Sequence, residues 1–351
     1  MFDTVMIIKK QINIPAKIYK NTIGININHI KNTPNIYFLL FDEYAGLQSL
    51  KDSFQYDNSL FYNKLKSDSF TILPTFSNYS ITQFSMASML NMNYIKNIKD
   101  STIVGWEETQ KQMLDIKNAD IFVAFKNIGY TIKSFSLFEI GANKSIGGNQ
   151  FLLGHKRVLT NKILHNVLLK DIGYNFVTGK YATNFIQKIF LGDLPIYNNK
   201  VEIGLNYSIK NIKSPQFVYA HFLMPHFPFL FDSLGKKVPN NILFKKNNWL
   251  NKGEYISYLK FCNSKIIEYE QLIKNRDPNA IIILMSDHGY RYSPQNLSTS
   301  TFNNFCAVRN LQNKNPPSSI SNVNFFRYVL NSNFNQLLPY LNDKTIALFE
   351  K

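Results

Sequence analysis

The sequence has few cysteines and no long apolar run. Cys262 and Cys306 lie in no CxxC or other spaced cluster, so neither a disulfide framework nor a thiolate zinc site is supported, although a single bridge stays open. No apolar run reaches the roughly 18–20 residues that a membrane-spanning helix needs. The N-terminus, MFDTVMIIKKQINIPAKIYK, lacks the apolar core and small-residue cleavage site of a signal peptide. We therefore expect a soluble chain, or the soluble part of a larger membrane protein.

Motifs for nucleic-acid binding are also missing. The sequence shows no RRM, zinc-finger or basic-zipper pattern, which makes nucleic acid the weakest candidate partner. Lysine and arginine nevertheless exceed aspartate and glutamate, 39 to 23, for a formal net charge of +16. The basic residues are scattered along the chain, which fits an anionic membrane surface, an anionic substrate or simply a solvated lysine-rich surface.

The order of apolar segments predicts an α/β fold. The chain has 351 residues, 45% of them hydrophobic, which is enough for a substantial core, and it contains no internal repeat. Strands are expected at 35–41, 130–136, 216–223, 280–285 and 302–308, and helices at 53–70, 82–90, 107–128, 158–192, 254–275 and 323–330. This alternation of apolar strands with helices is typical of a mostly parallel, buried sheet. We interpret residues 1–33 as a lead-in and residues 34–351 as one domain.

Three of the expected strands end in residues that can bind a metal. Asp42 follows the first strand, His221 and His226 lie at the end of the third, and Asp287 and His288 follow the fourth. In open α/β sheets, functional groups collect beyond the carboxyl ends of the strands. We therefore expect these side chains to lie close together in the fold.

Each of these features alone also has an ordinary structural explanation. Asp287 and His288 can reach one ion if the backbone turns sharply, which Gly289 permits, but Asp-His-Gly is equally a simple turn. Asp42 can be a capping or strand-end aspartate. Glu43 is a possible substitute ligand, although neighbouring strand residues point to opposite faces, and we favour Asp42.

Small hydroxyl residues recur in the segment SITQFSMASMLN (80–91). The start of a helix near Thr82 would offer free N–H groups and a positive dipole end to an anionic phosphoryl or sulfuryl group. A metal bound to the Thr82 hydroxyl would favour its alkoxide, which is a nucleophile at neutral pH. The alternative is a helix cap followed by small residues that pack helix on sheet, and this is the stronger interpretation for Ser85 and Ser88.

Taken together, the motifs resemble the alkaline phosphatase superfamily, in particular its sulfatase-like branch with lipoteichoic acid synthases and lipid A phosphoethanolamine transferases. The resemblance spans about residues 35–310 and rests on NIYFLLFDEY (35–44), SNYSITQFSMASMLN (77–91), HFLMPHFP (221–228) and SDHG (286–289). It implies an alkaline phosphatase-like three-layer sandwich, with a mostly parallel central sheet flanked by helices.

The resemblance also implies a metal centre and a nucleophile. By position, Asp42, Thr82, Asp287 and His288 would hold one divalent cation, Zn²⁺ or Mn²⁺. Thr82 would attack phosphorus and form a phosphothreonine enzyme. Mixed oxygen and nitrogen ligands suit both ions, and the sequence does not choose between them.

The remaining implied residues concern the substrate. His226 and His221 fall where the family binds substrate phosphate or a second metal, and they would stabilise charge or protonate the leaving group. The sequence has no histidine shortly after SDHG, which puts a full second metal site in doubt and leaves Arg291 to pair with substrate oxygens. It also lacks the Cys/Ser-x-Pro-x-Arg motif that yields formylglycine, which disfavours sulfate-ester hydrolysis by that chemistry.

These features predict a metal-dependent phosphoryl or phospho-head-group transferase, or a phosphodiesterase, that acts on an anionic lipid or cell-surface glycan. The alternatives are a hydrolase of small phosphate, phosphonate or sulfate esters and an inactive sulfatase-like domain that binds a glycan. The family implies an extracytoplasmic location and allows contact with a membrane surface. Transfer versus hydrolysis and the oligomeric state stay open.

Overall fold

The computed structural model describes residues 24–26, 30, 32–147, 187, 191–192, 194–245, 247–291, 297, 299–312 and 317–350. The lead-in expected over residues 1–33 and the helix expected over 158–192 lie almost entirely outside these residues.

A six-stranded sheet forms the centre of the described part of the chain, in the order β2-β9-β7-β1-β6-β5. Its strands are β1 (Ile36–Phe41), β2 (Phe70–Ile72), β5 (Thr131–Phe135), β6 (Gln216–Phe222), β7 (Ile281–Met285) and β9 (Cys306–Arg309). Strands β5, β6, β1 and β7 run parallel, whereas β9 is antiparallel to β7 and β2 is antiparallel to β9. The mostly parallel sheet predicted from the sequence is therefore confirmed.

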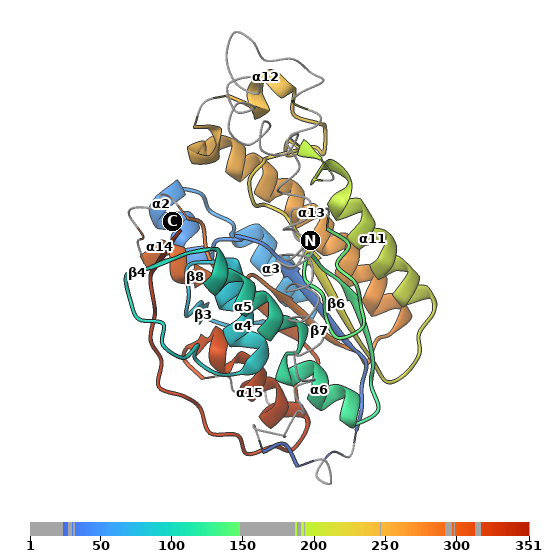
Figure 1. Cartoon of the computed structure of the whole chain (residues 1–351). Helices are drawn as coiled ribbons and strands as arrows, with labels where there is room; N and C mark the ends of the chain where they lie inside the picture. The colour runs from blue at the N-terminus through green and yellow to red at the C-terminus, as the bar shows by residue number, and fades with distance from the viewer. Residues whose placement is uncertain are drawn as a thin grey trace, which may run out of the picture.

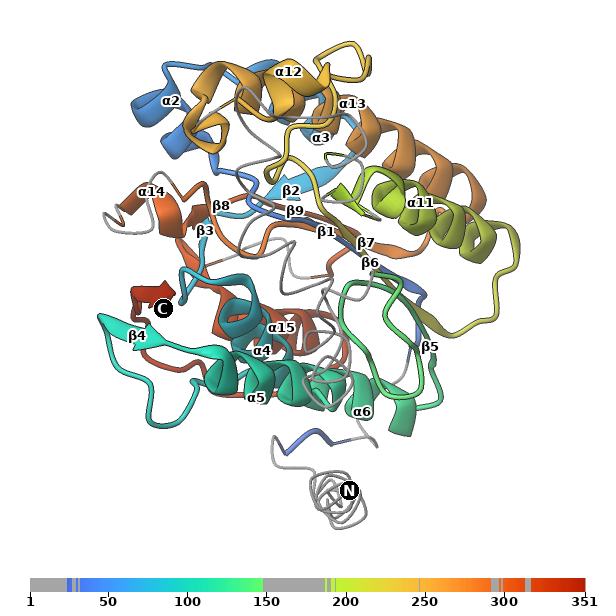
Figure 2. The same ribbon diagram turned by 45° about the horizontal axis from the view of Figure 1, so that its top comes forward.

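Helices cover both faces of this sheet, which makes a three-layer sandwich (Figures 1 and 2). One layer contains α2 (Leu47–Phe54), α3 (Ser59–Ser67), α11 (Leu194–Lys210), α12 (Asn240–Leu243) and α13 (Lys252–Arg276). The other contains α4 (Thr82–Asn91), α5 (Trp106–Lys117), α6 (Asp120–Asn127) and α15 (Asn322–Asn333). A strand between two helical layers has no solvent-facing side, which explains why β1 and β7 are continuously apolar and fully buried.

Short elements complete the fold beside α4. One small sheet has the order β10 (Ile320–Ser321), β3 (Thr75–Phe76) and β8 (Asn303–Asn304), and α14 (Thr299–Phe302) leads directly into β8. A second pairs β11 (Leu348–Glu350) with β4 (Thr102–Val104) in parallel. A 3₁₀ turn, η3 (Asn248–Leu250), leads into α13. Among the described residues, no helix is both long and apolar enough to cross a membrane.

Several helices and strands that the sequence predicted as continuous are divided in the structure. The helix expected over 107–128 is two helices, because Asn118 ends α5 and Ala119 has an extended backbone before α6. The segment 53–70 contains the end of α2 and all of α3, and the strand expected over 302–308 is divided into β8 and β9. Helix α11 was not expected as a separate element.

The register of the central strands places the strand ends side by side. Leu40 of β1 pairs with His221 of β6 and with Met285 of β7. The backbone N–H of Asp42 donates to the carbonyl oxygen of Phe222 at 3.0 Å. The residues that follow β1, β6 and β7 therefore meet at one edge of the sheet.

Candidate active site

Three buried side chains converge where β1 and β7 end. The ligand atoms of Asp42, Asp287 and His288 all lie within 4.8 Å of one another. Asp42 Oδ1 and Asp287 Oδ2 are buried and have no hydrogen-bond partner among the described residues. Asp287 Oδ2 also lies 3.1 Å from His288 Nε2. Buried carboxylate oxygens without donors are costly unless a cation balances them, so this donor set fits a divalent metal ion.

The imidazole of His288 is held in the tautomer that a metal ligand needs. Its Nδ1 lies 2.7 Å from the carbonyl oxygen of Gly289. Because a carbonyl oxygen only accepts, Nδ1 carries the proton and Nε2 presents its lone pair toward Asp287 and Thr82.

Gly289 is needed for a different reason than the sequence suggested. Its φ is not in the left-handed region. A Cβ at this position would instead lie 2.3 Å from the carbonyl oxygen of Ser300 and 2.4 Å from that of Asn303. The glycine thus allows the chain at 300–303 to pack directly against the loop, and its own N–H donates to Thr301 at 2.8 Å.

Thr82 lies beside this cluster at the start of α4. Its Oγ1 is 3.1 Å from His288 Nε2. The N-cap of α4 is Ile81, and no side chain caps the helix. The Thr82 hydroxyl therefore does not act as a helix cap, and the N–H groups of the first turn are not occupied by a cap.

Two polar side chains fix the backbone of Asp287. Ser85 Oγ and Asn322 Nδ2 both donate to its carbonyl oxygen, each at 2.6 Å. Ser85 was expected to be a packing residue, whereas Ser88 bonds the carbonyl oxygen of Asn93 at 2.9 Å and takes no part in the cluster. Asn322 was not anticipated, because an asparagine at the start of a helix carries no distinctive signal.

Glu43 reaches the site although it neighbours Asp42. It adopts a left-handed conformation with φ 61° immediately after β1, so the alternation of strand side chains no longer applies to it. Its N–H donates to Asp287 Oδ1 at 3.0 Å. Its carboxylate accepts the backbone N–H of Arg291 at 2.8 Å and lies 3.7 Å from His226 Nε2. Glu43 thus faces the two cationic groups of the site.

His221 lies behind Asp42, within the sheet. It is fully buried, and its Nε2 is 3.3 Å from Asp42 Oδ2. Its Nδ1 is 2.9 Å from the Tyr219 hydroxyl. Burial raises the pKa of Tyr219 well above its usual value, so the phenol stays protonated and donates to Nδ1. Nε2 then carries the proton that is shared with Asp42, and this geometry favours a positioning role over contact with substrate.

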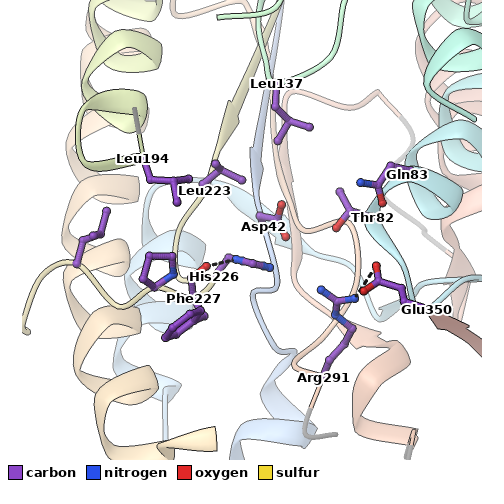
Figure 3. A pocket seen from close by; sticks show the side chains of 12 residues that line it. Asp42, Thr82, Gln83, Leu137, Leu194, Leu223, His226, Phe227, Arg291 and Glu350 are labelled. Carbon is purple, nitrogen blue, oxygen red and sulfur yellow. Dashed lines mark hydrogen bonds and ion pairs between the residues drawn. The ribbon is translucent and has the colours of Figure 1, made fainter. Parts of the chain in front are cut away.

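A cavity of about 250 Å³ opens beside the cluster (Figure 3). Asp42 and Thr82 point toward one another across it, and His226, Arg291 and Glu350 also line it. Its remaining lining residues are Gln83, Leu137, Leu194, Leu223, Phe227, Pro228 and Leu230. The cavity therefore has a charged side near Thr82 and an apolar side, and His221 is not part of its described lining.

The charges around the cavity shift one another's protonation. Burial acts to raise the pKa of Asp42, but the positive charge of His226 and a hydrogen bond from His221 outweigh it and hold the pKa below its usual range. Burial acts to lower the pKa of His226, whereas the charges of Asp42 and Glu43 raise it, and the net pKa is raised. Without a bound cation, His226 thus keeps its proton to a higher pH than a free imidazole does, which lets it serve as a proton donor.

No family model and no curated relative matches this sequence. Solved structures with a related fold are nevertheless found. The C-terminal periplasmic domain of EptC from Escherichia coli, in complex with Zn, has a TM-score of 0.55 and 9% identity, with 87% of this chain and 83% of that chain covered. The C-terminal periplasmic domain of phosphoethanolamine transferase EptC from Campylobacter jejuni has a TM-score of 0.50 and 13% identity, with 87% and 91% covered.

A sulfatase has a comparable likeness. BT1596, a 2-O GAG sulfatase, has a TM-score of 0.51 and 11% identity, with 90% of this chain and 73% of that chain covered. Identities this low establish the fold and not the activity. The chain thus has the alkaline phosphatase-like fold shared by sulfatases and phosphoethanolamine transferase domains, as its four motifs predicted.

Proposed function

We propose that this chain is a metal-dependent phosphoryl or phospho-head-group transferase, or a phosphodiesterase, with Thr82 as its nucleophile. One observation supports this above all: the Thr82 hydroxyl lies 3.1 Å from His288 Nε2, beside two buried carboxylates that each have an oxygen without a donor. A domain that only binds a glycan would not need a hydroxyl nucleophile beside a complete set of metal ligands.

Asp42, Asp287, His288 and Thr82 would hold the cation. Three oxygens and one nitrogen suit Zn²⁺ or Mn²⁺. Such an ion supplies Lewis acidity, which lowers the pKa of the Thr82 hydroxyl and stabilises charge on the phosphoryl group. His221 keeps Asp42 oriented through its hydrogen bond to Oδ2, in the manner of residues that support metal ligands.

The chain's own groups then carry the reaction. Thr82 gives up its hydroxyl proton to solvent, and its Oγ1 forms a bond to phosphorus as the bond from phosphorus to the leaving oxygen breaks in line. His226 donates a proton to that leaving oxygen. Arg291 and the uncapped N–H groups at the start of α4 stabilise the charge on the other phosphoryl oxygens. Water or an acceptor alcohol then attacks phosphorus, gives its proton to the now neutral His226 and displaces Thr82 Oγ1, which takes a proton from solvent.

The cavity suits a substrate with a charged group and an apolar part. Leu194, Leu223 and Phe227 lie on the same side of the cavity as His226, across from Arg291 (Figure 3). We infer an anionic lipid or cell-surface glycan as substrate, used outside the cytoplasm and near a membrane surface. The names of the structural neighbours, which are phosphoethanolamine transferase domains and a sulfatase, support this class.

The test is to trap the intermediate. The protein is loaded with Zn²⁺ or Mn²⁺, incubated with bis(p-nitrophenyl) phosphate or a labelled phospholipid, quenched with acid and mapped by mass spectrometry. The expected adduct lies on Thr82, and it is absent from Thr82→Ala but present on Thr82→Ser, which keeps the hydroxyl. Full turnover by Thr82→Ala, or an adduct on another residue, contradicts the proposal.

A further inference from the structure

The C-terminal strand brings a carboxylate into the cavity that none of the motifs predicted. Glu350 ends β11 and lines the cavity near Thr82 and Gln83 (Figure 3). Its strand is fixed beside the nucleophile, because Ser80 Oγ accepts the backbone N–H of Leu348 at 2.8 Å and donates to its carbonyl oxygen at 3.1 Å. Glu350 therefore belongs to the same rigid unit as the start of α4.

Two carboxylates share the guanidinium that lines this cavity. Arg291 is the one lysine or arginine among the described lining residues. It lies between two carboxylates: its Nε is 3.8 Å from Glu43 Oε1 and its Nη1 is 3.9 Å from Glu350 Oε1. Arg291 is thus shared between two carboxylates, of which Glu350 lines the cavity.

We propose that Glu350 is a specificity-determining residue that favours monoanionic phosphodiesters over dianionic phosphomonoesters. This inference rests on the proposed function. A phosphomonoester carries about −1.5 to −2 charges at neutral pH, whereas a diester carries about one. The additional negative oxygen of a monoester would have to share Arg291 with Glu350 and Glu43, and a diester presents a neutral substituent there instead.

The size of the effect follows from Coulomb's law. Two like charges several ångströms apart at a protein surface alter an equilibrium about three- to tenfold. The Glu350 side chain is 62% exposed, so this repulsion is screened by salt, and losing the side chain costs little stability. An effect of replacing Glu350 that shrinks with added salt thus comes from its charge, whereas one that does not comes from a change in the shape of the cavity.

The experiment compares Glu350→Gln with the wild type in the metal-loaded protein. The readout is the ratio of kcat/KM for p-nitrophenyl phosphate to that for bis(p-nitrophenyl) phosphate. We expect the ratio to rise about three- to tenfold at low ionic strength and the rise to shrink at about 0.5 M salt. Glu268→Gln is the matched control, because it removes the same charge from an exposed position on α13 that is not part of the described cavity lining.

An unchanged ratio in Glu350→Gln, or an equal change in Glu268→Gln, overturns the inference. Calorimetric titration with inorganic phosphate gives a readout that does not need turnover. Glu350→Gln should bind phosphate about three- to tenfold more tightly than the wild type, with and without metal. If neither ester is turned over, the proposed function fails. The titration still tests the role of Glu350, because equal phosphate affinities of the variant and the wild type overturn that role.

Discussion

Asn322 holds the carbonyl oxygen of Asp287 with a 2.6 Å hydrogen bond from its side-chain amide. Ser85 donates to the same oxygen, and Asn322 Nδ2 is also 3.2 Å from Ser85 Oγ. The first residue of α15 and a residue of α4 therefore clamp the loop that carries two proposed metal ligands. The orientation of the Asp287 carboxylate depends on side chains from both helices.

Replacing Asn322 by alanine should weaken metal binding. Loss of a residue that orients a metal ligand typically costs about 10- to 100-fold in metal affinity, and we expect that range here. Competition with a zinc chelator measures it. Asn324→Ala is the control on the same helix, since Asn324 bonds Leu341 and Asp343 away from the site. Equal losses of affinity in both variants would show that general destabilisation, and not the clamp, is responsible.

Asp287→Asn should have opposite effects on stability in the absence and presence of metal. Asp287 Oδ2 is buried without a hydrogen-bond partner in the described structure, so removing its charge should stabilise the metal-free protein. Metal at 100 times its dissociation constant stabilises the wild type by about 2.7 kcal/mol, and the variant should lose this gain.

Thermal melts with and without Zn²⁺ or Mn²⁺ measure both effects. The amide oxygen of the variant can still accept the N–H of Glu43, which Asp287 Oδ1 accepts at 3.0 Å, so the fold is retained. A wild type whose melting temperature does not respond to either metal would contradict the proposed centre.

The sequence predicted the parts of the site that sit on long apolar strands. β1 and β7 are uninterrupted apolar runs, and the charged residues that follow them stand out for that reason. Asn322 and Glu350 were not predictable in this way. An isolated asparagine or glutamate in a polar segment has no local signal, and its role depends on contacts between residues far apart in the chain. The roles of Gly289 and His221 likewise depend on which groups pack against them, which a motif does not specify.

Ser80→Ala should lower kcat more than it changes KM. Ser80 lies two residues before the proposed nucleophile, Thr82. It is fully buried and makes two hydrogen bonds to the backbone of Leu348. Losing them frees the loop before α4, and an ångström of misplacement can cost about 100-fold in rate. Steady-state kinetics on bis(p-nitrophenyl) phosphate test this, with Ser88→Ala as the control at the other end of α4. A pure KM effect would argue against a positioning role for Ser80.

Glu270→Gln should make the protein more stable at alkaline pH. Glu270 is fully buried on α13, and neither of its carboxylate oxygens has a hydrogen-bond partner in the described part of the chain. Burial, followed by the negative charge of Asp68, raises its pKa from 4.5 to about 7. The favourable contribution of the neutral carboxyl is thus complete below pH 4.5 and is lost as the pH rises through about 7.

Above that range the folded wild type holds a buried charge, which costs on the order of 2–3 kcal/mol. Urea unfolding at about pH 5 and about pH 8 tests this. At the lower pH the free energies of unfolding of the variant and the wild type should differ little. At the higher pH that of the variant should be larger by the cost of the buried charge. Glu268→Gln, an exposed neighbour on the same helix, should show no such dependence on pH. A stability difference of the same size at both pH values would mean that Glu270 is ionised throughout, with Lys64 and Lys274, whose charges act on it, outweighing its burial.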